Sequence, residues 1–310
     1  MISTWRTIGI ALSVTCSLLQ AGIIDHLKPA SGKDPISKMR NVDFIYTINL
    51  DQRPEKFAKC VAQLHPYGIS PYRFSAVNGW ELTEEDINDV GLVFQQGMDG
   101  GFMGTSYLPN TEGPTHGLIE NEGQVYFCHC MSRGAIGIVL SHLSVLLDAW
   151  RSGYDTIWVM EDDIEVLQDP RKISDLIDEL DARLGRRGWD VLFTDQDIRD
   201  ANGQYVPSYG MARRPNFHPT SVDKYIKREM LGEKFMLTGS RFGAHSMIIR
   251  RNGIKKIINF ILTHQIFFPY DMDYYLPENI RMYSLIEDIV SNQPKALSDN
   301  GGPNYLKKPS

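Results

Sequence analysis

The strongest constraint on the fold is a buried strand that ends in three acids. Residues 156–160 have the composition of a fully buried strand and are followed at once by Glu161, Asp162 and Asp163. Carboxylates this close together raise each other's pKa unless a positive charge lies among them. A hard divalent cation with oxygen ligands meets that need, and strand ends in open α/β sheets are where ligands bind. A solvated acidic turn is the plain alternative.

The neighbouring segments alternate between strand and helix patterns. Residues 42–50 predict a strand, residues 54–64 predict a helix that begins at Pro54, and residues 72–77 predict a second strand. Further helices are predicted at 134–150, 176–184 and 253–264, and further strands at 189–194, 244–250 and 283–290. This order predicts an α/β fold with a Rossmann-like, mostly parallel sheet and helices on both faces.

Two long stretches lack any helix or strand period. Glycines recur through residues 91–124, and prolines interrupt the polar residues 200–235. Long loops inside compact domains are usually functional. We therefore expect 91–124 to be an active-site or acceptor loop, and 200–235 to be a variable excursion that helps to choose the acceptor.

The ends of the chain differ in composition from its middle. Arg6 precedes an uncharged apolar run over residues 7–23, a pattern typical of a signal peptide or membrane anchor. We expect residues 24–41 to be a linker, 42–295 one catalytic domain and 296–310 a flexible tail. The protein is then exported or membrane-associated through residues 7–23, the alternative being the cytoplasmic face of the membrane.

The overall charge restricts the partners. The chain has 310 residues, 42% of them hydrophobic and 23% charged, and a formal net charge of −6. These values are typical of a soluble globular protein. Because no stripe of lysine and arginine offsets the negative charge, the sequence predicts no nucleic-acid partner.

Four short motifs follow one another along the chain. They are INLDQR at 48–53, FSAVNG at 74–79, GAIGIVLSH at 134–142 and VMEDD at 159–163. In this order and spacing they resemble glycosyltransferase family 25, lipopolysaccharide-type glycosyltransferases related to collagen galactosyltransferases. The resemblance covers about residues 42–295. It implies a GT-A-like fold and inverting transfer of a hexose, with galactose favoured, from a UDP-sugar to a glycan or glycoprotein acceptor.

The resemblance also assigns roles to the acids. It implies that Mn²⁺ or Mg²⁺ binds at the acidic motif and neutralises the charge that develops on the departing diphosphate. We expect Asp163 to be the direct ligand, with Asp162 second and Glu161 supporting. Asp271 matches the family position of a base that takes the acceptor proton, and Asp195 and Asp273 are the next candidates.

The donor is expected at the ends of the first two strands. Arg53 can bind a phosphate through two hydrogen bonds, although a plain surface cation is the alternative. With the resemblance, Ser141 and the catalytic candidate His142 become site residues rather than parts of a buried helix. The expected donor-binding residues are Asn49, Leu50, Arg53, Ala76, Val77, Asn78, Gly79 and Ser141.

Two other functions stay open. A metal-dependent phosphodiesterase or nucleotidyltransferase would need a second ligand cluster, which Asp195 and Asp197 offer. A non-catalytic glycan-binding or surface protein would keep the fold without the reaction, because fold alone does not secure function. Export from a bacterium favours this last reading, since nucleotide sugars are cytoplasmic there. A lumenal compartment in a eukaryotic or viral setting would supply the donor.

Overall fold

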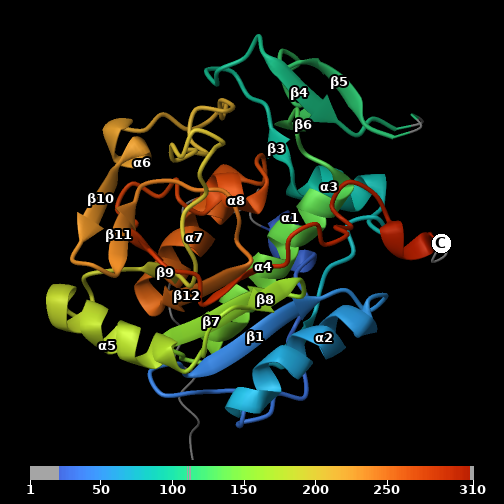
Figure 1. Ribbon diagram of the computed structural model, residues 1–310. Coiled ribbons are helices and arrows are strands. Elements are labelled where there is room, and N and C mark those ends of the chain that lie inside the picture. The colour runs from blue at the N-terminus through green and yellow to red at the C-terminus, as the bar shows by residue number, and fades with distance from the viewer. Residues whose placement is uncertain (1–20, 110, 112, 308–310) are drawn as a thin grey trace, which may run out of the picture.

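A large central sheet organises the protein. The computed structural model describes residues 21–109, 111 and 113–307. Eight strands lie in the order β10-β11-β13-β9-β12-β7-β1-β2 (Figure 1). Their bounds are β1 Phe44–Asn49, β2 Tyr72–Ser75, β7 Thr156–Glu161, β9 Val191–Phe193, β10 Arg228–Leu231, β11 Phe235–Thr238, β12 Ser246–Arg250 and β13 Met282–Leu285. Strands β8 (Ile164–Val166) and β14 (Val290–Asn292) form a separate pair.

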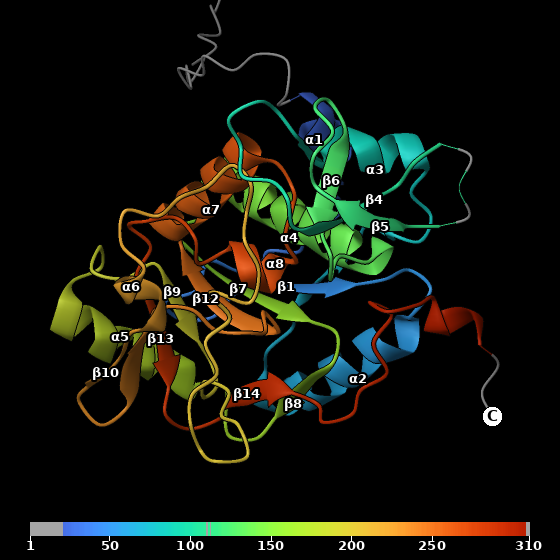
Figure 2. The ribbon, with the colours of Figure 1, turned by 90° about the horizontal axis from the view of Figure 1, so that it is seen from above.

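Helices cover both faces of this sheet, as the sequence predicts. Helices α4 and α7 lie on one face, and α2 lies on the other, beside β8 and β14 (Figure 2). The helices are α1 Ala21–Asp25, α2 Pro54–Leu64, α3 Glu84–Val90, α4 Arg133–Arg151, α5 Lys172–Leu184, α6 Asp223–Ile226, α7 Arg251–His264 and α8 Tyr270–Asp273, with short 3-10 turns at His65–Tyr67 and Asn304–Leu306.

The alternation of side chains along β7 divides the interior into two cores. Ile157 and Val159 join the core that contains residues of α4 and α7. Trp158 and Met160 join the core that contains residues of α2 and α5. Because both faces of β7 are covered, its only accessible part is its carboxyl end, where the acids lie.

The strand directions are more mixed than the sequence predicts. Strand β1 is parallel to β2 and β7, and β13 is parallel to β9. Strand β12 lies between β7 and β9 and is antiparallel to both. After β9 ends, the chain reaches Ser246 at the same edge of the sheet, opposite Met160, so β12 must run back in the opposite direction. The central sheet is therefore mostly parallel but mixed, because β11 and β12 run against the other strands.

Residues 91–124, expected to form a loop, instead build most of a small antiparallel sheet. Its order is β3-β6-β4-β5, with β3 Leu92–Val93, β4 Met103–Ser106, β5 Thr115–Leu118 and β6 Val125–Cys128. The strands are only two to four residues long, too short to give a pattern in the sequence. Gly104 pairs with Gly117, so a residue type that weakens strand prediction lies within two of the strands.

The segments outside the expected domain make specific contacts. Ile23 is fully buried, and Lys28 Nζ donates to the carbonyl of Ala76 over 2.7 Å. The predicted signal peptide or anchor at 1–23 lies outside the described residues, except for its last three positions. Among the described helices, α4 has the length and apolar composition to cross a membrane, but most of it is buried inside the fold.

The loop after β2 packs tightly on α4, and this contact gives a first prediction. A Cβ on Gly137 would lie 2.5 Å from Gly79 N and 2.7 Å from Val77 O. Ala favours a helix over Gly by about 1 kcal/mol. The clash is with backbone atoms that cannot turn aside, so we expect Gly137→Ala to destabilise the protein by about 2 kcal/mol in urea unfolding.

Gly117→Ala is the matched control, because a Cβ added at Gly117 would meet no atom within 4 Å. We expect that variant to unfold like the wild type. A Gly137→Ala protein that is as stable as the wild type would contradict the tight contact.

Candidate active site

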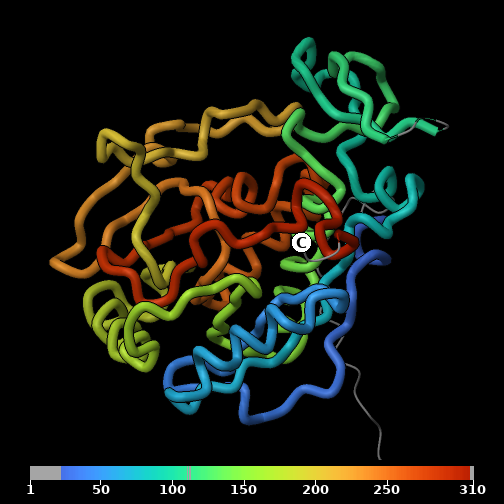
Figure 3. The backbone as a smooth tube through the Cα atoms, turned by 45° about the vertical axis from the view of Figure 1, so that its right-hand side comes forward, coloured from blue at the N-terminus to red at the C-terminus, as the bar shows by residue number. Residues whose placement is uncertain are grey.

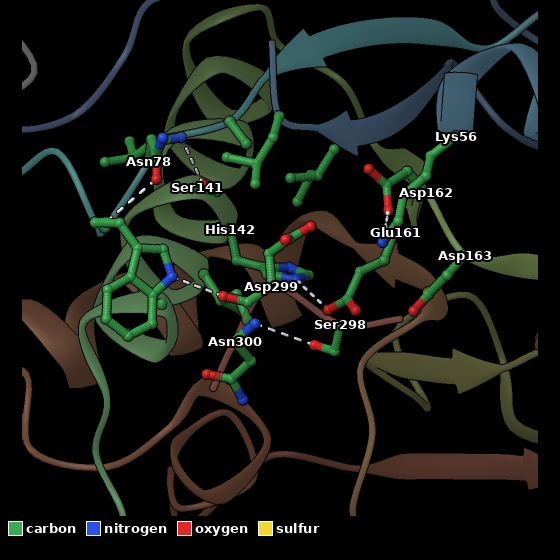
Figure 4. Close-up of a pocket in the computed structure, with 18 residues that line it drawn as sticks. Lys56, Asn78, Ser141, His142, Glu161, Asp162, Asp163, Ser298, Asp299 and Asn300 are labelled. Carbon is green, nitrogen blue, oxygen red and sulfur yellow. Dashed lines mark hydrogen bonds and ion pairs between the residues drawn. The ribbon is translucent and has the colours of Figure 1, made fainter. Parts of the chain in front are cut away.

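Two cavities lie at the carboxyl ends of β1, β2 and β7. The first cavity is lined by Ile48, Leu50, Lys56, Ala76, Val77, Asn78, Gly79, Trp80, Gly134, Ile138, Ser141, His142, Glu161, Asp162, Asp163, Ser298, Asp299 and Asn300 (Figure 4). The second cavity is lined by Ala135, Ile138, Glu161, Asp163, Gly243, Ala244, His245, Pro269, Tyr270, Asp271, Asn292, Ser298 and Asn300. Glu161 and Asp163 line both cavities and so lie where the two meet.

The first two acids have partners of their own. Glu161 Oε1 lies 3.1 Å from His142 Nε2, and the His142 ring stacks on Tyr270 with centroids 4.0 Å apart. Burial alone would raise the pKa of Glu161, but the hydrogen bond and charge of His142 lower it below its ordinary value. Asp162 turns the other way, accepting from Asn49 Nδ2 over 2.7 Å and lying 3.5 Å from Lys56 Nζ.

Asp163 is the acid without a partner. Its Oδ1 is buried and has no hydrogen-bond partner among the described residues. Burial, followed by the charges of Glu161 and Asp162, raises the pKa of Asp163 to about 6. An unpartnered buried carboxylate oxygen is unfavourable, so this atom has the strongest need for a cation.

The acids fit a hard cation only in part. Within the described residues, no group of three or more His, Cys, Asp or Glu side chains is arranged to hold a metal ion. Asp162 is occupied by Asn49 and Lys56, which leaves the oxygens of Asp163 and Glu161 facing the cavities. Mn²⁺ and Mg²⁺ take oxygen ligands, and Mg²⁺ commonly binds one or two carboxylates together with substrate phosphates. The residues present therefore fit an ion whose other ligands come from a bound substrate.

Most of the expected donor-binding residues form one wall of the first cavity. Leu50 and residues 76–79 line it, as does Ser141. Ser141 Oγ accepts from the backbone N–H of Val77 over 2.8 Å and donates to the carbonyl of Gly137 over 2.6 Å. This hydrogen bond fixes the end of β2 against α4, so Ser141 both lines the cavity and shapes its wall.

Two expected donor ligands are directed elsewhere. Asn49 does not line either cavity, since its side chain bonds Asp162, the carbonyl of Arg53 and, through Oδ1, Arg73 Nε. Arg53 does not line them either, because its guanidinium binds both carboxylate oxygens of Asp299. Asn49 thus orients the acidic motif, and Arg53 is covered by the C-terminal segment.

The base candidates occupy different positions. Asp271 lines the second cavity and accepts from the backbone N–H of Gly243 over 3.1 Å. Burial raises the pKa of Asp271, and the charge of Glu161 adds to this rise, although the Gly243 N–H opposes it. Asp273 is fully buried and pairs with Arg214 over 3.1 Å, so it lies away from the cavity wall.

Asp195 lies behind the second cavity rather than in its wall. Its carboxylate is 2.6 Å from His245 Nε2 and 3.1 Å from Arg241 Nη2. Burial alone would raise the pKa of Asp195, but the charge of Arg241 and the hydrogen bond of His245 lower it. Asp197 pairs with Arg228. Since both acids already have cationic partners, they do not offer the second metal cluster that a phosphodiesterase or nucleotidyltransferase would need.

Several lining residues escape sequence reasoning. Lys56 lies on a helix face whose pattern predicts exposure to solvent, and His245 immediately precedes β12 with no pattern to mark it. Of these residues, Trp80 could have been predicted, because it directly follows the second motif. Residues 298–300 lie in a segment whose glycines and prolines predict only a tail.

Comparison with known proteins identifies the family. Residues 42–274 match the description "Glycosyltransferase family 25 (LPS biosynthesis protein)", and this match covers most of the chain. The chain belongs to glycosyltransferase family 25. A "Glycosyltransferase 25 family member" of Aedes aegypti is 28% identical over 172 residues, which are 54% of this chain and 23% of that protein. One of Drosophila melanogaster is 30% identical over 142 residues, 46% of this chain and 19% of that protein.

Some relatives of this family 25 chain are named as inactive. The human "Inactive glycosyltransferase 25 family member 3" is 24% identical over 152 residues, 49% of this chain and 21% of that protein. The chain spans about a fifth of the length of the curated relatives it matches. Among solved structures, A197 from STIV aligns with a TM-score of 0.34 and 13% identity, over 80% of this chain and 82% of that one.

The environment of Asp163 gives a pH-dependent prediction. Since its folded-state pKa is about 6 and its ordinary value is 3.8, ionisation costs more in the folded than in the unfolded protein. This cost is absent below pH 4 and complete above the folded pKa, so stability falls as pH rises through 4 to 6. We expect Asp163→Asn, in chelator, to match the wild type at pH 4 and to exceed its unfolding free energy at pH 7.5 by about 3 kcal/mol.

Asp175→Asn serves as the control, because the Asp175 side chain is 80% exposed. Its stability difference from the wild type should stay nearly constant with pH. The same flat profile for Asp163→Asn would show that Asp163 is not strained by burial and charge.

Proposed function

We propose that this protein is an inverting glycosyltransferase that moves a hexose, with galactose favoured, from a UDP-sugar to a hydroxyl of a glycan or glycoprotein. The observation that carries the proposal is the meeting of two cavities at Glu161 and Asp163 in a member of family 25. A transferase needs one site for the donor and one for the acceptor, with the reacting atoms between them. The carboxyl-edge position of both cavities supports a GT-A-like arrangement.

The first cavity suits a nucleotide-sugar donor. It lies at the carboxyl ends of β1, β2 and β7, where ligands bind in open α/β sheets. Leu50 and Val77 offer apolar surface, and Asn78 and Trp80 offer a side-chain amide and an aromatic face. The acids lie at the other side of this cavity, where the diphosphate and sugar would meet the second cavity.

Asp163 and Glu161 would hold Mn²⁺ or Mg²⁺ together with the donor's diphosphate. The ion would neutralise the negative charge that develops on the leaving diphosphate. The chain's own residues prepare this position. His142 holds Glu161 in place from the core, and Asn49 and Lys56 bind the carboxylate of Asp162. The unpartnered oxygen of Asp163 is thereby left for the donor complex.

The second cavity suits the acceptor, and Asp271 is the proposed base. In a single displacement, the acceptor oxygen bonds the anomeric carbon as the bond to the diphosphate breaks, and the hydroxyl proton passes to Asp271. Burial brings the pKa of Asp271 above that of an ordinary aspartate, which favours proton uptake near neutral pH. His245, held by Asp195, lines the same cavity and can position the acceptor.

A non-catalytic glycan-binding protein is the second candidate. It is favoured by relatives in human and mouse that are named inactive members of the same family. Such a protein would keep the second cavity without using the donor site. Donor binding therefore separates the two candidates.

The first prediction from this proposal concerns donor binding. Because the first cavity has more carboxylates than cations, we expect UDP to bind only with Mn²⁺ or Mg²⁺ present. Asp163→Ala should weaken this binding by about a hundredfold, the scale of a lost charged ligand. Isothermal titration of the full chain with UDP, with and without Mn²⁺, measures both effects.

The exposed Asp175→Ala variant is the control and should bind UDP like the wild type. Metal-independent UDP binding, or none in the wild type, would contradict the proposed donor site.

The second prediction separates the base from the donor site. Asp271→Asn retains a similar shape and the contact with Gly243 while removing the proton acceptor. We expect transfer from UDP-galactose to fall by about 10²- to 10⁴-fold, with UDP affinity within about twofold of the wild type. Single-turnover assays with glycan and glycoprotein acceptors measure transfer, and parallel titrations with UDP measure affinity. Loss of both together would show that Asp271 supports the donor site instead.

A further inference from the structure

The C-terminal segment folds back over the first cavity. Figure 3 shows this red segment returning against the body of the protein. We call residues 298–306 the C-terminal strap. Ser298, Asp299 and Asn300 line the first cavity together with the acids. The strap therefore forms part of the wall of the proposed donor site.

Polar contacts hold the strap in place. The carbonyl of Asp299 accepts from Trp80 Nε1 over 2.7 Å, and the hydroxyl of Tyr305 accepts from Asn78 Nδ2 over 2.9 Å. Ser132 Oγ donates to the carbonyl of Asn300 over 2.7 Å. None of the strap residues belongs to either hydrophobic core, and Leu306 is 72% exposed. A segment held without apolar burial can separate from the protein at low cost.

The strongest of these contacts is an ion pair. Arg53 Nε donates to Asp299 Oδ2 over 2.8 Å, and Arg53 Nη2 donates to Asp299 Oδ1 over 3.0 Å. Asp299 is only 9% exposed, and its Oδ1 also accepts from the backbone N–H of Tyr305. A planar guanidinium that binds a carboxylate through two parallel hydrogen bonds can bind a phosphate in the same way.

The ion pair changes the charge that an anionic donor would meet. With the strap in place, four acids line the first cavity: Glu161, Asp162, Asp163 and Asp299. Among the described lining residues, Lys56 alone is a lysine or arginine. Arg53 lies behind Asp299 and does not reach the cavity. A diphosphate that enters this cavity therefore meets the carboxylate of Asp299. If the strap moved away, the diphosphate would meet the guanidinium of Arg53 at the same place.

We propose that the C-terminal strap is a gate opened by the donor, in which a phosphate of the nucleotide replaces Asp299 on Arg53. This inference rests on the proposed function, because the replacing anion is the donor's diphosphate. The exchange trades one two-point anion contact for another, so Arg53 keeps a partner throughout. Opening also removes one negative charge from the cavity. Arg53 thereby becomes a donor-binding residue only in the open state.

Two variants release the strap by different means. Asp299→Asn removes the charge that holds Arg53 while keeping the side-chain size. Gly134→Ala adds a methyl group that would lie 2.4 Å from the carbonyl oxygen of Asn300, and it leaves every charge unchanged. We expect both variants to bind UDP with Mn²⁺ about tenfold more tightly than the wild type, the scale of one charge-assisted contact.

The matched control is Glu55→Gln. Glu55 Oε1 lies 3.3 Å from Arg53 Nη1, but Glu55 is 52% exposed and does not line the cavity. This variant removes the same charge from the same arginine without touching the strap. Its UDP affinity should equal that of the wild type, so a general electrostatic effect would be recognised.

Hydrogen exchange of the full chain provides the second measurement. We expect residues 298–306 to exchange faster in Asp299→Asn and Gly134→Ala without ligand, and faster in the wild type once UDP and Mn²⁺ are added. Slower exchange on adding UDP, or variants that bind UDP no better than the wild type, would show a fixed wall and overturn the gate alone. No UDP binding by the wild type or either variant would overturn the proposed function as well.

Discussion

The confinement of three carboxylates at the end of a fully buried strand is the constraint on which the site depends. Like charges in a partly desolvated position must be neutralised, separated or left at a cost in free energy. The protein treats the three acids differently. His142 from α4 hydrogen-bonds Glu161, Asn49 and Lys56 bind Asp162, and Asp163 is left with the cost. The elements that surround β7 thus give three adjacent acids three different environments.

This unequal treatment also explains why two cavities meet at one point. Glu161 and Asp163 line both cavities, whereas Asp162 lines only the first. Members of the family that are named inactive caution against equating the fold with the reaction.

Sequence reasoning identified the strand end with its acids and the helices on both faces, because each follows from a local pattern. The family resemblance added residues 76–79 and Ser141, which line the first cavity. The antiparallel direction of β12 could not be predicted, because it depends on where a long excursion returns to the sheet. Residues 91–124 were expected to be a loop because short, glycine-bearing strands have no period of their own. The pairing of Arg53 with Asp299 joins residues 246 positions apart, a distance that no local pattern can report.

The several roles of helix α4 restrict how its sequence can change during evolution. The same helix fills a hydrophobic core, fixes the end of β2 through Ser141, orients Glu161 through His142 and touches the strap at Gly134. A substitution there alters several properties at once, so selection on any one of them restrains the others. The small β3-β6-β4-β5 sheet shares few of these duties. Substitutions can therefore accumulate in that sheet while the sequence of the helix stays nearly unchanged.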